Sequence, residues 1–275
     1  MFKETPILKL AKHCSCFPGY QLKMVLASLV EENTDGQLWT APQSQGRCLQ
    51  LLWDQGNNVF YFAGEPITTE VTTELAALLR GEIRNRAAEA GLSWFKVCLL
   101  PRWDEKVLDD LFPEINLKQV NKLLFGFEAL QPYPVKPPEV EGIEFALIDR
   151  AFLERNDLEN LNSVREEIDW MWSGSGRNRS QEFGVAAVAD NRVICWCTAE
   201  YVSQNMCGIG IETLPEYEKR GVATATTVRF VERCLKRKLK PFWECDRENI
   251  GSVRVAEKVG FRLLEERIFH AGKFS

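Results

Sequence analysis

Runs of apolar residues separated by turn residues predict an alternation of strands and helices along the chain. Before residue 131 the strand-like runs are QLWTA, CLQLLWD and VFYFAG. The last two are joined across the sequence Gln55-Gly56-Asn57-Asn58, which is typical of a hairpin turn. A helical pattern from Thr68 to Ala90 follows, and after it come the apolar run WFKVCLLP, a short helix near Asp104 to Leu111 and the run KLLFGFEAL. This part of the chain therefore predicts sheet, helix, strand, helix and strand.

The later part of the chain repeats this order. Its strand patterns are GIEFALID, FGVAAVA, RVICWCTAEYV and GIGIET, with helical stretches between Leu153 and Trp172 that separate the first two. A helix that starts near Gly221, the run PFWECD, a helix that ends at Gly260 and the strand FRLLEERIFH complete it. Because the two parts share an order of elements without evident sequence identity, the pattern favours a degenerate structural duplication.

A proline-rich segment separates the two parts. The stretch QPYPVKPPEVEG, from Gln131 to Gly142, contains four prolines, which disfavour a helix or a central strand. We therefore predict an N-terminal α/β domain over residues 1–130, a linker over 131–142 and a second domain over 143–275. The expected fold class is α/β, of the α+β kind, in which helices flank a mixed sheet.

Composition narrows the class of protein. The 275 residues are 45% hydrophobic, enough for a sizeable core, and the net charge of -5 argues against a protein dedicated to nucleic acid. Nine cysteines in a chain without a secretory or membrane-spanning pattern favour reduced thiols and a cytoplasmic location. The pairs Cys14-x-Cys16 and Cys195-x-Cys197 lack the second pair that a zinc site requires, so no metal site is expected.

The segment EKRGVATATT has a glycine, Gly221, directly before a helix. The first turn of a helix has unpaired N–H groups and the positive end of the macrodipole, so it attracts anions. Gly221, Val222 and Ala223 leave these donors uncovered, so the turn can cradle a pyrophosphate, to which Lys219 and Arg220 add charge. The segment lacks the ending of a phosphate loop for nucleoside triphosphates and the three-glycine dinucleotide fingerprint.

The strand GIGIET precedes this turn. Alternation of side chains puts Gly208, Gly210 and Glu212 on one face and Ile209, Ile211 and Thr213 on the other. Glycine inside a strand marks either the close approach of a ligand or a loosened strand edge, and both interpretations stay open.

These two features together resemble the GNAT superfamily of N-acetyltransferases. The family's signature turn, Gln/Arg-x-x-Gly-x-Gly/Ala, reads Glu218-Lys219-Arg220-Gly221-Val222-Ala223 here, with Glu218 in place of the usual Gln or Arg. A second signature, Asn-x-x-Ala/Ser followed by Gly-Phe, appears in NIGSVRVAEKVGF as Asn249, Ser252, Gly260 and Phe261. The phrases IETLPEY and RGVATA are most similar to the branch that contains the zwittermicin A self-resistance acetyltransferase. The resemblance implies a GNAT-type mixed sheet after the linker, and the repeated order of elements favours a smaller, degenerate GNAT-like copy before it.

Acetyl-coenzyme A is the cofactor that the resemblance implies. Its pantetheine would lie along the splayed fourth strand of the domain, near Ile211 and Thr213. The pyrophosphate would meet the main-chain N–H groups of Lys219, Arg220, Gly221, Val222, Ala223 and Thr224. Cations of the following helix would attract the remaining phosphate, although a solvated helix surface explains them equally. Asn249 and Ser252 complete the predicted cofactor-binding set, and Asn249 also suits the N-cap of its own helix.

The expected chemistry is direct transfer, in which an amine attacks the thioester carbonyl and a base takes its proton. Glu212, on the glycine face of its strand, is the predicted base, with Glu200 as the second choice. Cys245 has no histidine near it in sequence, so a buried thiol is favoured over a nucleophile. The tyrosine that many relatives use as general acid is replaced by Ala256. Tyr201, Tyr217, Ser252 and solvent are the open alternatives.

The predicted acceptor is a small-molecule amine, with neither nucleic acid nor membrane as a partner, and the protein is expected to be a monomer or a homodimer. The acidic balance favours a cationic amine. The first half is expected to wall the acceptor pocket without binding a second cofactor, because its nearest glycine, in Arg80-Gly81-Glu82, lies mid-helix. Trp170 and Trp172 either line that pocket or pack in the core. Few residues follow FRLLEERIFH, which leaves little room for a seventh strand.

Two other functions stay open at this point. One is a non-catalytic sensor or scaffold that binds acyl-coenzyme A and has lost its acid–base groups. The absence of the family's tyrosine favours this alternative. The other is the transfer of longer acyl groups, or transfer to glycine, which changes only the substrates.

Overall fold

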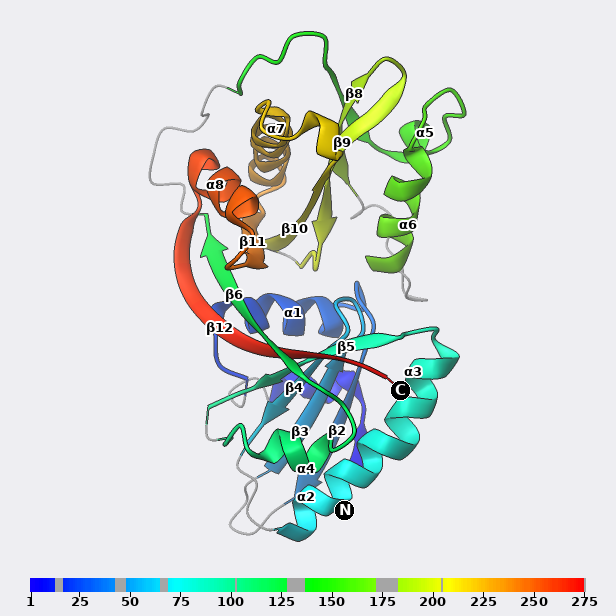
Figure 1. Ribbon diagram of the computed structural model, residues 1–275, viewed down its shortest axis with the longest axis vertical. Coiled ribbons are helices and arrows are strands. Elements are labelled where there is room, and N and C mark those ends of the chain that lie inside the picture. Colours follow the sequence, from blue (N-terminus) through cyan, green and yellow to red (C-terminus); the bar gives the residue numbers. More distant parts are fainter. Residues whose placement is uncertain are drawn as a thin grey trace. The chain divides into compact units, whose positions relative to one another are not determined.

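A computed structural model describes residues 1–12, 17–42, 48–64, 69–101, 103–127, 137–171, 183–203 and 205–274 (Figure 1). The chain forms two compact units. Unit 1 consists of Met1–Val30, Thr34–Asn121 and Arg267–Ser275, and unit 2 consists of Glu31–Asn33 and Lys122–Glu266. The predicted domain boundaries stay a prediction. The compact units group residues 122–127 with the later part of the sequence and residues 267–275 with the earlier part.

Unit 1 is built on a mixed sheet. Its strands are β1 (Lys3–Thr5), β2 (Gly36–Pro42), β3 (Cys48–Asp54), β4 (Val59–Ala63), β5 (Trp94–Leu99) and the end of β12 (Arg262–Lys273). Neighbours in this order pair antiparallel, except that β4 and β5 pair parallel. The expected hairpin between β3 and β4 is confirmed. The sequence does not predict β1, because three residues are too few to show an alternating pattern.

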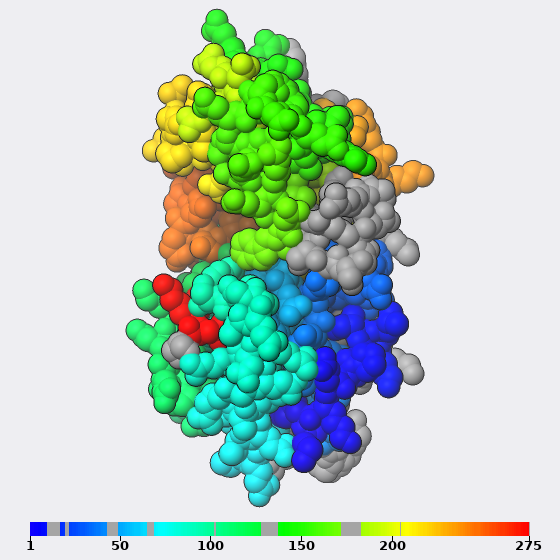
Figure 2. Space-filling model, turned by 90° about the vertical axis from the view of Figure 1, so that its right-hand side faces the viewer, coloured from blue at the N-terminus to red at the C-terminus, as the bar shows by residue number. Residues whose placement is uncertain are grey.

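The helices of unit 1 are a 3-10 helix (Ile7–Lys12), α1 (Tyr20–Val30), α2 (Thr69–Leu78), α3 (Arg84–Glu89) and α4 (Val107–Leu111). A π-helical turn, Leu79–Ile83, joins α2 to α3 and confirms the long helix expected here, seen in cyan at the surface of unit 1 (Figure 2). These two helices and α4 share one core with β2 to β5. The sequence does not predict α1, because its apolar residues lie on several sides of the helix and show no amphipathic period; the buried ones are Leu22, Met24, Val25, Leu26 and Leu29.

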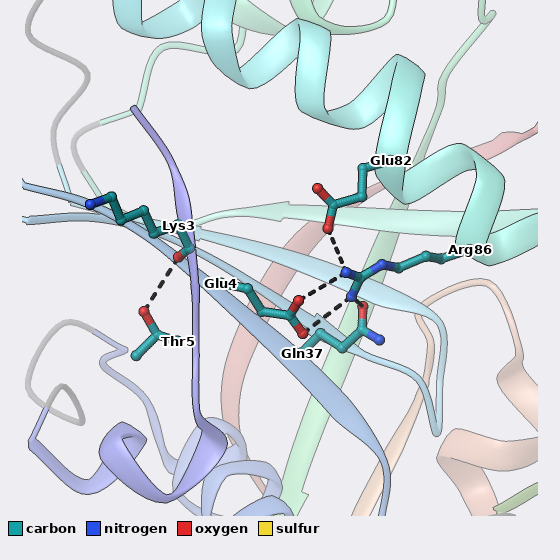
Figure 3. A network of polar contacts seen from close by, with 6 residues as sticks. All are labelled: Lys3, Glu4, Thr5, Gln37, Glu82 and Arg86. Carbon is teal, nitrogen blue, oxygen red and sulfur yellow. Dashed lines mark hydrogen bonds and ion pairs between the residues drawn. The ribbon is translucent and has the colours of Figure 1, made fainter.

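Arg86 of α3 fastens β1 to the helices of unit 1 (Figure 3). Its guanidinium donates hydrogen bonds to both carboxylate oxygens of Glu4, at 3.1 and 2.8 Å, and to Oε1 of Gln37, at 3.0 Å. It also pairs with Glu82 at 2.6 Å. The hydrogen bond from Arg86 lowers the pKa of the Glu4 carboxyl. Because all these side chains are partly exposed, such a network contributes about 1 kcal/mol or less to folding.

Unit 2 is likewise built on antiparallel and parallel strands. Its strands are β7 (Glu144–Ile148), β8 (Gly184–Ala189), β9 (Arg192–Glu200), β10 (Met206–Thr213), β11 (Lys240–Asp246) and the end of β6 (Lys118–Gly126). The neighbours pair antiparallel in this order, except that β10 and β11 pair parallel. The strands expected in this part of the sequence are therefore confirmed, with small changes at their ends.

The helices of unit 2 are α5 (Arg150–Leu153), α6 (Leu161–Met171), a 3-10 turn (Pro215–Tyr217), α7 (Val222–Lys236) and α8 (Ile250–Val259). The helical stretches expected between Leu153 and Trp172 are observed as the end of α5 and as α6, and residues 154–160 between them are not helical. The main chain of Glu159 bonds instead to Asn191 and Val193, and Asn160 takes a left-handed φ of 63°. This short excursion starts a new helix at Leu161. Trp172 lies outside the described residues.

The two units share the same sequence of strand pairings: three antiparallel pairs, one parallel pair and one antiparallel pair. The last strand in each unit comes from the other part of the sequence, and we call these two strands, β6 in unit 2 and β12 in unit 1, the exchanged strands. In unit 2, residues 122–126 of β6 pair with β11, from Phe242↔Gly126 to Asp246↔Lys122. In unit 1, residues 270–273 of β12 pair with β5. The topology supports the expected duplication, and the missing seventh strand of unit 2 is supplied by residues that precede the linker.

Lys122 anchors the exchanged strand in unit 2. Its Nζ lies 2.6 Å from Oδ1 of Asp246 and 3.6 Å from Oε1 of Glu244, and its side chain is 15% exposed. Burial alone would lower the pKa of Lys122, but the two carboxylates outweigh it and raise that pKa. The ion pairs therefore fix β6 beside the end of β11 that leads into α8.

Candidate functional site

The two parallel strands of unit 2 separate along their length. Pairing between β10 and β11 covers three positions and ends at Gly208 and Phe242, although β10 continues to Thr213 and β11 to Asp246. On its other side β10 stays paired with β9 as far as Thr213. The β11-facing edge of β10 beyond Gly208 thus has main-chain groups outside the β10–β11 ladder, and such groups require partners.

The turn after β10 leaves the start of α7 open. Gly221 is the N-cap residue of α7, with a left-handed φ of 83°, and no side chain caps the helix. A Cβ atom at Gly221 would meet no heavy atom within 4 Å, so space lies directly above this turn. Val222 is buried and packs with Cys195 and Ile194, whereas Ala223 is only half-buried. The first N–H groups of α7 therefore face an accessible space, as the sequence predicts.

A cleft of about 710 Å³ joins the separated strands to this turn. Its lining includes the predicted residues Ile211, Glu212, Thr213, Lys219, Gly221, Ala223, Thr224, Asn249 and Ser252. Three predicted residues are absent from that lining: Val222 belongs to the core, Glu200 lies beside Gly210, and the guanidinium of Arg220 stacks 5.2 Å from the ring centroid of Tyr217. The cleft is lined by both polar and apolar residues.

Helix α8 closes one side of the cleft. The Oδ1 atom of Asn249 accepts a hydrogen bond from the main-chain N–H of Ser252 at 3.0 Å, which confirms the predicted N-cap. The Oγ atom of Ser252 accepts a hydrogen bond from Trp243 Nε1 at 3.1 Å. Gly260 ends the helix with φ 108°. The second signature of the sequence therefore first builds a capped helix, whose start then borders the cleft.

Two of the cations that line the cleft come from α8, and these two were not among the predicted site residues. Arg254 and Lys258 line the cleft together with Lys219. On α7, in contrast, the guanidinium of Arg229 lies 3.7 Å from the ring centroid of Phe145 and that of Arg237 lies 4.2 Å from that of Phe183. The available signal was the spacing of Arg254 and Lys258, four residues apart and therefore on one helix face.

Glu212 lines the cleft and keeps part of its surface exposed to solvent. Burial raises the pKa of its carboxyl, and the negative charges of Glu167 and Glu218 raise that pKa further. A raised pKa makes a carboxylate a better proton acceptor near neutral pH. The glycine face predicted from alternation is confirmed by the register, in which Gly208, Gly210 and Glu212 lie opposite Glu200, Thr198 and Trp196.

Glu167 of α6 belongs to this face and was missed by the sequence analysis. Its carboxylate accepts hydrogen bonds from Nε1 of Trp196, at 2.6 Å, and from Oγ1 of Thr198. An added Cβ at Gly210 would lie 2.6 Å from Oε1 of Glu200, 2.9 Å from Oγ1 of Thr198 and 3.0 Å from Oε1 of Glu167. The absent side chain of Gly210 thus makes room for oxygens of the protein itself, which is a third reason for this glycine.

The position where many relatives have a tyrosine as general acid holds Ala256 here, which has no group that could donate a proton. Ala256 is fully buried, and Tyr201 is 3% exposed, whereas Tyr217 lines the cleft. Cys245 is buried, and burial raises the pKa of its thiol, which supports the predicted inert role. Among the described residues, no group of three or more His, Cys, Asp or Glu side chains is arranged to hold a metal ion.

Two further predictions concern surfaces. Trp170 on α6 is 45% exposed, so its side chain is not part of the core. Within the described ranges, no helix has the length and apolar character needed to cross a membrane.

Comparison with known proteins gives a consistent result. The family model for GNAT acetyltransferases matches residues 15–268. The uncharacterized N-acetyltransferase YdfB of Bacillus subtilis (strain 168) is 32% identical over 173 residues, which are 62% of this chain and 63% of that protein. The match therefore spans less than two thirds of the length of this curated relative.

Solved structures share the fold along almost the whole chain. A GCN5-related N-acetyltransferase-like protein from Streptococcus suis 89/1591 has a TM-score of 0.63 at 16% identity, covering 96% of this chain and 98% of its own. A GCN5-related N-acetyltransferase from Sphaerobacter thermophilus has a TM-score of 0.59 at 14% identity, covering 99% and 96%. A tandem GNAT protein from the clavulanic acid biosynthesis pathway has a TM-score of 0.57 at 11% identity, covering 100% and 99%.

Proposed function

Because the chain belongs to the GNAT acetyltransferase family, we propose that it is an acetyl-coenzyme A-dependent N-acetyltransferase that acetylates the amine of a small molecule. The observation that supports this most directly is the cleft of about 710 Å³ that joins the separated β10 and β11 to the uncapped start of α7. A long cosubstrate that ends in a thioester needs both an extended main-chain surface and an anion site.

The residues of the cleft fit the parts of coenzyme A. The free edge of β10 at Ile211 and Thr213 suits the amides of the pantetheine arm. The first N–H groups of α7, at Gly221, Ala223 and Thr224, suit the pyrophosphate, since three donors converge at the positive end of a helix. Lys219 adds a positive charge beside them, and Asn249 and Ser252 border the opposite wall. Val222 is assigned a main-chain role only, because its side chain is in the core.

Arg254 and Lys258 are the proposed partners of the remaining phosphate of coenzyme A. They lie on the cleft-facing side of α8, whereas Arg229 and Arg237 of α7 stack on aromatic rings. Arg220 stacks on Tyr217 and contributes its main-chain N–H or a flexible charge at the rim. This assignment replaces the basic face of α7 as the expected phosphate partner.

The proposed reaction is direct transfer. The acceptor amine attacks the thioester carbonyl, the new C–N bond replaces the C–S bond, and the thiolate of coenzyme A leaves. Glu212 removes the proton from the attacking nitrogen, and a main-chain N–H of β10 stabilises the negative charge on the carbonyl oxygen. Glu200 stays the second choice of base, because its carboxylate lies beside Gly210, two residues before Glu212 on the same face of β10. The leaving thiolate needs no dedicated acid, and Tyr217 is the tyrosine that borders the cleft.

The acceptor is proposed to be a cationic amine, because Glu212, Glu200 and Glu167 give its side of the sheet a negative charge. Membership of the zwittermicin A resistance branch, a wall of the acceptor pocket formed by the first half of the chain, and a cytoplasmic monomer or homodimer all stay predictions. An antibiotic amine and a metabolic amine are equally compatible with these carboxylates.

One specific observation favours a second candidate, a sensor that binds acyl-coenzyme A without turnover. The position of the expected general acid is Ala256, a buried alanine. The deciding experiment measures free thiol released from acetyl-coenzyme A over a panel of amines, beside calorimetric binding of coenzyme A. Binding with amine-dependent thiol release supports the transferase. Binding without release for any amine supports the sensor, and the absence of binding rejects both.

A further inference from the structure

Helix α6 carries a carboxylate on its buried side. Leu161, Val164, Ile168 and Met171 are the buried residues of this amphipathic helix, which packs against β9. Glu167 lies three residues after Val164 and four before Met171, so it shares their side of the helix. Figure 2 shows α6 in green at the surface of unit 2. Acidic residues are rare on such a stripe unless they are paired or functional.

We propose that Glu167 is a positioning residue for the acetyl transfer, whose fixed negative charge makes the neighbouring Glu212 a stronger proton acceptor. This inference rests on the proposed function, because it assigns the base role to Glu212. Glu167 itself is not proposed to touch the acetyl group or the acceptor nitrogen.

The first support is the way in which Glu167 is held. Its two donors, Trp196 Nε1 and Thr198 Oγ1, come from alternate residues of β9 and so from one face of the sheet. In the register, Trp196 lies directly opposite Glu212 and Thr198 directly opposite Gly210. Because side chains of directly opposite residues lie about 5 Å apart at Cβ, Glu167 is anchored at the strand position that faces Glu212.

The second support is Gly210. Its missing side chain lets Oε1 of Glu167 and Oε1 of Glu200 approach the strand, and any larger residue would push them away. Glu167 is half-buried, and its two hydrogen bonds replace part of the water that its carboxylate loses there.

The charged groups around Glu212 come from every neighbouring element. Glu167 approaches from α6, Glu200 from β9 and Glu218 from the turn after β10, while Lys219, Arg254 and Lys258 line the cleft on the other side. The pKa of Glu212 is raised first by burial, then by Glu167 and then by Glu218. All three contributions act in the same direction, and Glu248, a further acidic residue, also lines the cleft.

The test compares Glu167→Gln with Glu166→Gln, a matched control. Glu166 is the adjacent residue of the same helix and is exposed, so the control removes the same charge from the solvent side. Glu167→Gln is expected to shift the acid limb of kcat/KM to lower pH by about half to one unit, because a base with fewer negative neighbours loses its proton more easily. Glu166→Gln is expected to leave that limb in place.

A merely structural role of Glu167 would not move this limb. An unmoved limb in Glu167→Gln, or an equal shift in Glu166→Gln, overturns the proposal. Should Glu167→Gln lose its cooperative thermal transition, Glu167→Asp keeps the charge, and we expect the acid limb to stay within about 0.3 units of the parent. A full shift in this conservative variant also overturns the proposal.

A second measurement separates this inference from the proposed function. The pKa of the Glu212 carboxyl group can be measured by NMR from the chemical shift of its carboxyl carbon as a function of pH. The measurement is made in the parent and in Glu167→Gln, and Glu212→Gln assigns the signal. A lower pKa in Glu167→Gln supports the coupling even if no amine is acetylated, in which case only the proposed function fails. Thiol release combined with an unchanged Glu212 pKa rejects the coupling and keeps the function.

Discussion

The strand pairs β4–β5 and β10–β11 occupy the same place in the same pairing order, yet only one of them opens. In unit 1, β4 and β5 pair at four positions, which nearly exhausts β4, and every residue of β4 is buried. In unit 2, β10 and β11 pair at three positions and then separate, and the last residues of β10 are partly exposed. A single topology thus gives a closed core in one case and a cleft in the other.

The difference comes from side chains on the central strand. β4 reads VFYFA, whose large aromatic residues fill both faces of the sheet, and Phe60 and Phe62 belong to the core of unit 1. β10 reads MCGIGIET, whose glycines and Glu212 leave one face without bulk. The connections after the two strands also differ in sequence. The one after β4 contains the acidic Glu65 and Pro66, which has no main-chain N–H, whereas the one after β10 contains Lys219, Arg220 and Gly221, which suit an anion better. The two units share one pairing order, and the residues of one strand and one turn decide which of them has the cleft.

The largest expected effect concerns the exchanged strands. A chain that begins at residue 137 lacks β6 and leaves β11 as an unpaired edge, without the buried Leu124 and Phe125. We expect it to aggregate or to unfold without a cooperative transition, because an open apolar edge favours association. A chain that begins at residue 118 retains β6 and should keep a cooperative transition. Circular dichroism melts and gel filtration compare the two, and equal behaviour would show that the exchange is dispensable.

The next effect contrasts two glycines. Gly221→Val forces a branched side chain into a left-handed φ of 83° and into the space above the turn. We expect at least about a tenfold loss of coenzyme A affinity, since a left-handed conformation alone costs an L-residue about 1–2 kcal/mol. Gly81→Ala in unit 1 meets nothing within 4 Å and removes a helical glycine. It should stabilise the protein by about 0.5–1 kcal/mol without changing the affinity. Calorimetry and thermal melts measure both, and equal affinities in the two variants contradict the cradle.

A third prediction addresses the acid limb of activity. Glu212 must be deprotonated to act as a base, and its pKa lies above the ordinary 4.5. We therefore expect kcat/KM to fall as the pH drops through this raised pKa. Glu212→Gln should lower kcat/KM about a hundredfold at neutral pH, the typical size of one acid–base contribution, and should remove the limb. Steady-state rates between pH 5 and 9 test this, and an unchanged limb in the variant points to Glu200 instead.

A fourth prediction tests the cations of α8. The double variant Arg254→Ala/Lys258→Ala should weaken coenzyme A binding by about tenfold while dephospho-coenzyme A is bound as before, because two charge-assisted contacts to one phosphate are lost. Lys236→Ala, which removes an exposed cation at the end of α7, serves as the control. Should both ligands lose equal affinity in the double variant, the phosphate partner lies elsewhere.

The smallest expected effect lies in unit 1. Arg86→Met removes the contacts with Glu4, Gln37 and Glu82 at a partly exposed site. We expect a loss of about 0.5–1 kcal/mol in the free energy of unfolding, as for other exposed ion-pair networks, and unchanged binding of coenzyme A. A denaturant titration measures the first and calorimetry the second. A change in coenzyme A affinity would contradict the proposal that the residues of unit 2 form the cofactor site.

The sequence predicts the elements that depend on local pattern. Gly221 and Asn249 mark helix starts, and Gly260 a helix end, because caps have strong residue preferences. The alternation in GIGIET correctly assigns the face of Glu212. Contacts between distant residues are harder to predict. Glu167 meets Trp196 and Thr198 only through the packing of α6 on β9; its place on the apolar side of the helix is a local signal, but that signal does not name its partners. The source of the strand beside β11 is likewise invisible, since Lys122 and Asp246 are far apart in the chain.

The exchange of strands also sets the order in which the two sheets can be completed during synthesis. Unit 2 uses residues 122–126, which are synthesised before the rest of its sheet and wait for β11. Unit 1 uses residues 270–273, so its pairing with β5 waits until the residues of unit 2 have been synthesised. Since pairings that span most of the chain form slowly, the half without the cleft is expected to be the last to mature and the half most in need of chaperones during synthesis.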